Sequence, residues 1–268
     1  MSIGLTAVGM FGTSQAAETA GQTPERLVGM RRITQDQYRQ IIADVFGKTI
    51  KLGGRFEPDQ RDAGLLAVGA SQVSVTASGF EQYDDMARSI AAQVIDEQHR
   101  AVMIPCAPAS AQQPDDACAG KFLASVGRVL YRRPLTQREL ADEVKIASDV
   151  SSRLHDFYAG LGSALTGMLE SAQFLFRQET ARNDPADPAH LQLDGYSKAS
   201  RLAFLLWNSA PDLPLLEAAE HGDLDSSDGL NRQVGGRLLK LEDPLAACRA
   251  DPAGAACADF FKQMASRG

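Results

Sequence analysis

The chain has 268 residues with 34 acidic and 27 basic side chains, which give a formal net charge of -7 and an isoelectric point near 5.2. Lys and Arg form no cluster longer than a short pair, so the composition excludes binding of nucleic acid through a basic surface. A hydrophobic content of 44% with 23% charged residues is typical of globular domains and not of disordered or membrane-spanning chains. The length allows one large or two small domains, and no run is long enough for a transmembrane segment.

The amino terminus begins with a short apolar, Gly-rich run, Ile3 to Phe11, followed by small residues at the spacing that a signal peptidase reads. A positive segment before this run is missing, because no Lys or Arg precedes Arg26. Residues 1–17 are nevertheless interpreted as an export signal whose true start lies upstream, with the mature chain beginning near Ala17 or Glu18. A flexible leader is the alternative.

The four cysteines form two local pairs, Cys106 with Cys118 and Cys248 with Cys257, each in loop-like sequence. An even number of cysteines with short intervening loops predicts two disulfides and a periplasmic or secreted location. No Cys-x-x-Cys occurs and no His lies near either pair, so no metal site is expected. Free buried thiols are the alternative.

Two capping boxes predict where helices begin. Thr34 to Gln37 begins the first helix, which Gly47 is placed to end. After an irregular segment from Lys51 to Val75, Ser78 is expected to cap a second helix that runs toward His99. Thr136 to Glu139 is the second capping box.

The central segment is expected to hold a helix from Ala117 to Tyr131, stopped by Pro134, and one long core helix from His155 to Glu179. Gly160-Leu161-Gly162 lies inside that helical pattern and follows no strand. We therefore interpret these glycines as a site of close helix packing and not as a dinucleotide-binding loop.

A linker from Asn183 to Pro188 is the predicted boundary between an N-terminal helical domain, 18–182, and a C-terminal helical domain, 189–268, which can pack as one unit. No alternating strand pattern is longer than Gln72 to Thr76. The fold class is therefore predicted to be mainly α, a multi-helix orthogonal or bundle-like architecture with long loops. The C-terminal helices are expected near Tyr196–Trp207, Pro211–His221, Asp228–Leu241 and Ala255–Met264.

Motifs for catalysis or cofactor binding are not found in the sequence. It contains no attachment motif for a c-type haem, so no covalently bound cofactor is expected, and no zincin, serine-hydrolase or phosphate-loop pattern. Asp223 to Gly229 does not match the ligand spacing of a calcium loop, and Asp225 or Ser226 is expected to cap the next helix. Spacing pairs none of the histidines, His99, His155, His190 and His221, so each is assigned a surface or core-edge role.

Arginines supply the candidate binding residues. Arg132 and Arg133 follow a helix and can bond the unpaired carbonyls at its end. Arg201 lies in an otherwise apolar helix and needs a carboxylate partner if it is buried; the nearby choices are Asp194 and Asp212. Ion pairs that fix helices are the favoured interpretation, and ligand recognition is the alternative. The candidate set is Arg132, Arg133, Arg201, Trp207, Asn208 and Asp212.

Four segments in order carry a family resemblance: Arg31 to Gly47, Tyr131 to Thr136, Leu169 to Arg177 and Ser200 to Asp212. Together they resemble the planctomycete-type, cytochrome c-associated secreted proteins of unknown function. The resemblance covers residues 31 to 224 and implies an exported helical protein whose relatives carry or accompany a c-type cytochrome module. It supplies no catalytic residues, and it implies that this chain corresponds to the front portion of a longer architecture.

Two functional hypotheses follow. The first is an extracytoplasmic binding or scaffold subunit that docks a c-type cytochrome or the remaining family modules, with any haem on the partner chain and the acidic surface steering a basic partner. The second is a component of a secreted oxidoreductase or polymer-degrading enzyme with a pocket near Arg132, Arg201 and Trp207.

Overall fold

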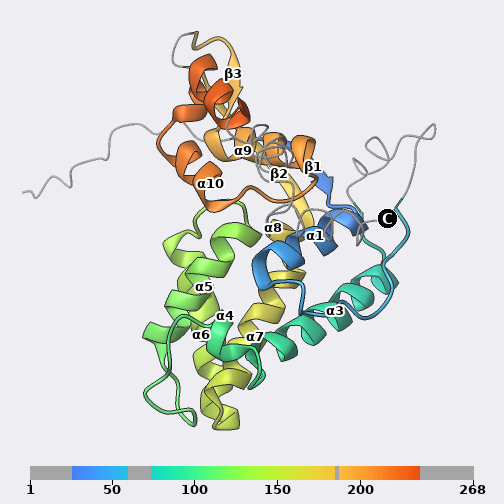
Figure 1. The fold of residues 1–268 in the computed structure, drawn as a ribbon, viewed down its shortest axis with the longest axis vertical. Helices are drawn as coiled ribbons and strands as arrows, with labels where there is room; N and C mark the ends of the chain where they lie inside the picture. The colour runs from blue at the N-terminus through green and yellow to red at the C-terminus, as the bar shows by residue number, and fades with distance from the viewer. Residues whose placement is uncertain (1–25, 60–73, 185–186, 236–268) are drawn as a thin grey trace, which may run out of the picture.

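The computed structural model describes residues 26–59, 74–184 and 187–235, and the chain is predominantly helical, as the sequence predicts (Figure 1). None of the described helices is long and apolar enough to cross a membrane. The predicted export signal, the Cys248–Cys257 pair and the helix predicted at 255–264 lie outside the described residues.

The first capping box is confirmed. Helix α1 spans Gln35–Phe46; the Thr34 hydroxyl accepts a hydrogen bond from the Gln37 amide, and the Gln37 side chain accepts one from the Thr34 amide. Gly47, with a φ of 80°, ends the helix because a residue without a Cβ takes that conformation readily.

Helix α3, Ala77–Ile95, is present, but the prediction that Ser78 caps it is wrong. Thr76 is the cap: its backbone is extended and its hydroxyl accepts a hydrogen bond from the amide of Gly79. Ser78 lies inside the first turn, where its backbone is already helical and cannot take the cap conformation.

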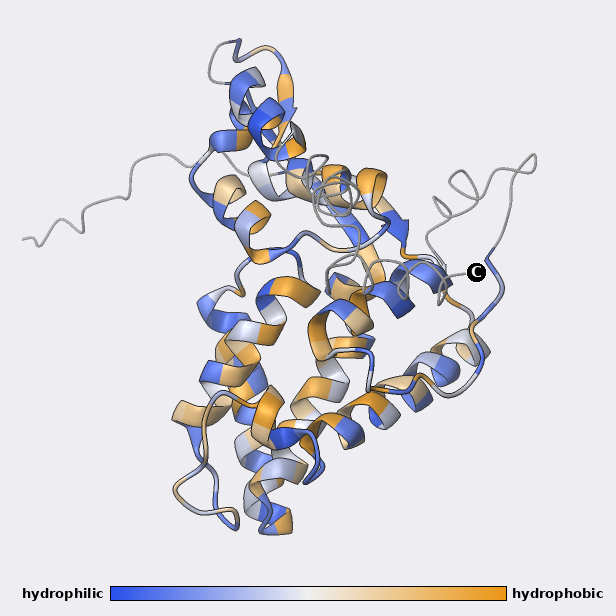
Figure 2. Cartoon of the chain, viewed as in Figure 1, coloured by the Kyte–Doolittle hydropathy of each residue, from blue (hydrophilic) through white to orange (hydrophobic). Residues whose placement is uncertain are grey.

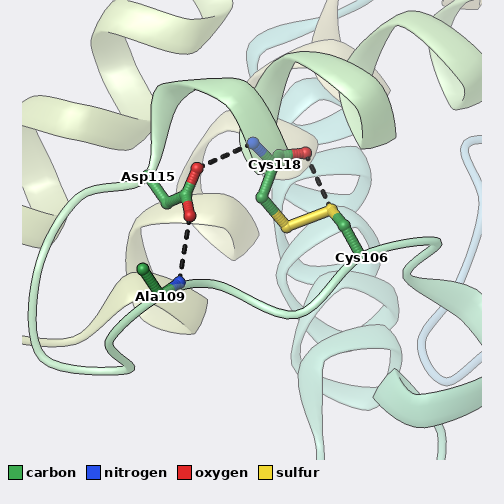
Figure 3. The surroundings of a disulfide bond; sticks show 4 residues. All are labelled: Cys106, Ala109, Asp115 and Cys118. Atoms are coloured by element: carbon green, nitrogen blue, oxygen red, sulfur yellow. Dashed lines mark hydrogen bonds between the residues drawn. A yellow bond between two sulfur atoms is a disulfide. The ribbon is translucent and has the colours of Figure 1, made fainter.

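A disulfide closes the loop between α4, Arg100–Met103, and α5, Asp116–Leu130 (Figure 3). The predicted Cys106–Cys118 bond is confirmed by an S–S distance of 2.08 Å. Asp115 caps α5 through the Cys118 amide and also accepts from the Ala109 amide. The 3.2 Å approach of the Cys106 sulfur to the Cys118 carbonyl is a packing contact, because a disulfide sulfur has no proton to donate.

The single long helix predicted from His155 to Glu179 is wrong. After α6, Gln137–Leu154, which the second capping box begins as predicted, α7 runs only over Phe157–Glu170. Ser171 then adopts an extended conformation and caps the short helix α8, Ala172–Leu175. Directly after α8, Phe176–Asn183 form a β-strand.

The sheet has three antiparallel strands in the order β1-β2-β3, which are Arg26–Arg32, Phe176–Asn183 and Leu191–Leu193. In its register Arg31 lies opposite Arg177, and Ala181 pairs with Leu193. The pattern of residues does not predict these strands, because RLVGMRR and FRQETARN are rich in charged and polar residues and lack the apolar alternation of a half-buried strand.

Most of the core lies where α1, α3, α5, α7 and α8 meet; Figure 2 shows apolar residues concentrated on the facing sides of these helices. A second, smaller core joins α9, Gly195–Leu206, with α10, Leu213–Glu220, and the 3-10 turn η1, Asp223–Asp225. Its buried members are Ala199, Ala203, Leu215, Ala218, Ala219 and Leu224. The domain boundary at 183–188 stays a prediction.

Strand β2 connects the two cores by fixing the start of α9. The Thr180 hydroxyl donates to the carboxylate of Asp194, the N-cap of α9, and the Thr180 amide donates to the Ser197 hydroxyl over 2.9 Å. Further along, Ser226 caps the next helix, as predicted, by accepting from the Gly229 amide over 3.1 Å.

The predicted role of Gly160 in close helix packing is confirmed at the crossing of α6 and α7. A Cβ at Gly160 would collide with the Ser151 hydroxyl and with the Ala147 carbonyl oxygen. Gly167, seven residues further along α7, has open space where its Cβ would stand.

We predict that Gly160→Ala lowers the free energy of unfolding by about 2 kcal/mol, because the helices must separate to admit a methyl group. Gly167→Ala is the matched control and should raise it by about 0.5–1 kcal/mol through helix propensity. Urea denaturation followed by circular dichroism measures both. Equal effects of the two substitutions would contradict the packing role.

Candidate functional site

An open groove of about 810 Å³ lies between the end of α1, helices α4 and α5, and the loop that joins α9 to α10. Val102 on its wall is 87% exposed and Leu213 is 48% exposed. Large apolar side chains gathered in an open groove are typical of a binding surface. The apolar lining comprises Ile41, Val45, Phe46, Val102, Met103, Val126, Val129, Trp207, Ala210, Pro211, Leu213 and Pro214.

Hydrogen bonds fix the α9–α10 loop against α1. The Ser209 hydroxyl donates to the Asp44 carboxylate over 2.6 Å, and the Gln37 side-chain amide donates to the Asn208 side chain over 2.9 Å. The Trp207 indole N–H donates to the Ala210 carbonyl over 3.3 Å, which turns the loop back on itself. This wall of the groove is therefore held in place before any ligand arrives.

The opposite wall is held by the disulfide. Val102 belongs to α4, whose C-terminal end leads through the buried Ile104 to Cys106. The bond from Cys106 to Cys118 ties that segment to the first turn of α5 (Figure 3). Reduction of this bond is expected to free the segment that carries Val102.

The charges in the groove are negative. Its lining includes the carboxylates of Asp44 and Asp212, and none of the described lining residues is Lys or Arg. Asp212 also caps α10 by accepting from the Leu215 amide over 3.0 Å. The groove therefore combines an apolar wall with a negative rim.

Arg132 is a buried structural group. Its guanidinium donates to four backbone carbonyls, those of Leu130, Gln173, Phe174 and Phe176, and this confirms the prediction that an arginine here bonds the carbonyls at a helix end. Burial lowers the pKa of Arg132 to about 9, with smaller contributions from Arg177 and Arg133. With a φ of 60°, Arg132 has a backbone conformation that is costly for a residue with a Cβ.

Arg133 also has a structural role, at the start of α6. It makes two hydrogen bonds of 2.8 and 2.7 Å to the carboxylate of Glu139 in the first turn of α6. The hydrogen bonds from Arg133 are the largest cause of the low pKa of Glu139, about 2. The pair therefore ties the loop after α5 to the start of α6.

Neither carboxylate predicted as the partner of Arg201 is its partner. Arg201 instead binds the buried Glu179 on β2, with distances of 3.0 Å from Nε and 2.6 Å from Nη2. Asp194 and Asp212 are occupied as N-caps of α9 and α10. Hydrogen bonds from Arg201 are the largest cause of the lowered pKa of Glu179. The sequence did not indicate Glu179 as the partner because it did not indicate strand β2, which carries Glu179.

The structure does not bring Arg132, Arg201 and Trp207 to one pocket. Arg132 and Arg133 line a cavity of about 90 Å³, Arg201 and Asn208 line a hollow of about 590 Å³, and Trp207 and Asp212 line the groove. Within the described parts of the chain, no group of three His, Cys, Asp or Glu residues could hold a metal ion. The single pocket that the enzyme hypothesis places near Arg132, Arg201 and Trp207 is therefore not found, since the three residues line three separate cavities.

Comparison with known families gives three matches. Residues 31–96 match the family PSD3, protein of unknown function (DUF1587). Residues 118–179 match PSD5, protein of unknown function (DUF1595), and residues 193–250 match PSD4, protein of unknown function (DUF1592). The chain carries these three modules in tandem. No curated protein and no solved structure matches the chain.

The groove lies where the three modules meet. Asp44 belongs to the PSD3 region, Val126 to PSD5 and Trp207 to PSD4, whereas Val102 lies between the first two. Of the groove residues, Trp207 and Asp212 were predicted from the sequence as binding candidates. Val102 was not, because a lone Val in a short helix gives no signal of exposure.

We predict that Arg132→Gly lowers the free energy of unfolding by about 3 kcal/mol or more, since it leaves buried carbonyls without donors. Glycine accepts the φ of 60°, so the loss measures the guanidinium and not backbone strain. His155→Gly is the matched control, because His155 ends α6 with a φ of 52°. It should be neutral or stabilising by about 0.5–1 kcal/mol. Chemical denaturation in which Arg132→Gly costs no more than His155→Gly would contradict the assignment.

Proposed function

We propose that this chain is an extracytoplasmic binding subunit that docks a c-type cytochrome in the groove between its three modules. The observation that carries the proposal is the groove itself, with exposed Val102 and Leu213 beside the carboxylates of Asp44 and Asp212. In this proposal the haem belongs to the partner, and this chain supplies the surface that positions it.

The location outside the cytoplasm is supported by the Cys106–Cys118 disulfide. Disulfides persist in oxidising compartments and are rare where thiol reductants are abundant. The bond also holds the segment that carries Val102. The same pair of residues therefore indicates an oxidising compartment and helps to shape the groove.

Charge and size both favour a basic redox protein as the occupant. The net charge of -7 attracts a basic partner over distances of about 10 Å at moderate ionic strength. Interfaces of redox proteins are small and transient, which suits one groove with an apolar wall and two carboxylates. An exposed haem edge is apolar and matches a wall of Val, Leu and Trp side chains.

Trp207 is the only Trp in the chain and lies on the groove wall, so its fluorescence reports occupancy directly. Titration with a basic monohaem c-type cytochrome at low ionic strength should quench Trp207 to saturation, because haem accepts its excitation energy. Calorimetry under the same conditions gives the affinity independently of fluorescence.

We predict that Val102→Asp weakens cytochrome binding by about tenfold, equivalent to about 1.4 kcal/mol, because it puts a carboxylate in the apolar part of the interface. Leu154→Asp is the matched control: Leu154 is 61% exposed at the end of α6 and does not line the groove. Unchanged affinity for Val102→Asp, or equal losses for both variants, would refute the groove as the docking site.

A further inference from the structure

A second hollow, of about 590 Å³, lies between β1, β2, the start of α1 and the end of α9. It borders the groove at Asn208, whose neighbour Trp207 lines the groove. Three arginines line it, one on each of β1, β2 and α9. These are Arg31, Arg177 and Arg201.

The strand register places two of these arginines together. Arg31 on β1 lies directly opposite Arg177 on β2. Like charges at directly opposed positions of an antiparallel pair repel each other and destabilise the sheet. An anion between them would remove that cost.

The carboxylates nearby are already engaged. Both oxygens of Glu179 are bound, one by Arg201 at 2.6 Å and one by Arg177 at 3.0 Å as well as by Arg201. Asp36 lies 3.5 Å from Arg39. The side chain of Arg31 makes no ion pair or hydrogen bond with any of the described residues.

Arg177 also keeps donor capacity. Its Nε is buried and has no hydrogen-bond partner among the described residues. Its guanidinium carbon lies 4.9 Å from the centre of the Phe204 ring, which is a cation–π contact. A buried N–H without an acceptor is costly, so the hydrogen-bonding capacity of Arg177, which lines the hollow, is not fully met by the described residues.

The balance of charge and polarity indicates what kind of anion fits. Three arginines against Asp36 and Glu179 leave one net positive charge in the lining, which matches a single negative charge. Beside the arginines lie Phe204 and Leu205, and Leu205 is 80% exposed. A carboxylate attached to an apolar group matches both the single net positive charge and the apolar side chains of the lining. A doubly charged phosphate meets repulsion from the two acidic side chains.

We propose that this hollow binds the carboxylate group of an organic monoanion, which Arg31 and Arg177 hold from two sides while Leu205 contacts its apolar part. Guanidinium groups suit this task because their planar N–H pairs match the geometry of a carboxylate. The site lies outside the groove and does not rest on the proposed cytochrome docking.

Benzoate is a suitable probe, with benzamide as its uncharged counterpart and inorganic phosphate as the competing anion, all at one ionic strength. Ligand-observed NMR titration of the full chain should give saturable binding of benzoate, with benzamide and phosphate each about tenfold weaker. Arg31→Gln should weaken benzoate binding by about tenfold. This variant should still fold, because Arg31 is exposed and has no side-chain partner among the described residues.

Arg138→Gln on α6 is the matched control, because its side chain is 92% exposed and lies outside the hollow. It removes the same charge and should leave benzoate binding unchanged. The proposal is overturned if benzoate shows no saturable binding, if phosphate binds more tightly than benzoate, or if Arg31→Gln and Arg138→Gln bind benzoate equally.

Discussion

The buried guanidinium of Arg132 is the interaction on which the arrangement of this protein depends. It joins the end of α5 to the junction of α8 and β2 by binding carbonyls from both. A charge removed from water is tolerated only when its hydrogen-bonding capacity is met, so these segments must stay together. Strand β2 begins at this junction, and through Thr180 and Glu179 it fixes α9. The position of the α9–α10 loop therefore follows from a contact made inside the helical core.

That chain of contacts explains why the three matched regions line one groove. The loop fixed through β2 meets α1 at the Ser209–Asp44 hydrogen bond, and the disulfide places Val102 across from it. Each wall of the groove is thus held by a different kind of constraint, a hydrogen-bonded loop on one side and a covalent bond on the other. A surface built in this way needs little reordering when a partner binds, which lowers the entropic cost of association.

Features set by local sequence could be predicted, and features set by distant contacts could not. Both capping boxes, the Cys106–Cys118 bond and the packing at Gly160 depend on residues close in sequence or on a single steric demand. The strand that begins at Phe176 was predicted as helix because Phe176 continues the apolar spacing of α7, and its strand conformation comes from pairing with β1. For the same reason Glu179 was not predicted as the partner of Arg201. Of the groove lining, the candidate set contained only Trp207 and Asp212.

Hydrogen exchange followed by mass spectrometry, on the full chain with and without a basic monohaem c-type cytochrome, measures directly whether the groove is the docking site. If a cytochrome docks there, amide exchange slows at α4 and in the α9–α10 loop, segments far apart in sequence that share the groove. Exchange in α6 stays unchanged, because α6 contributes no residue to the groove. Protection confined to α6, or no protection in either groove segment at saturating cytochrome, would rule out docking in the groove.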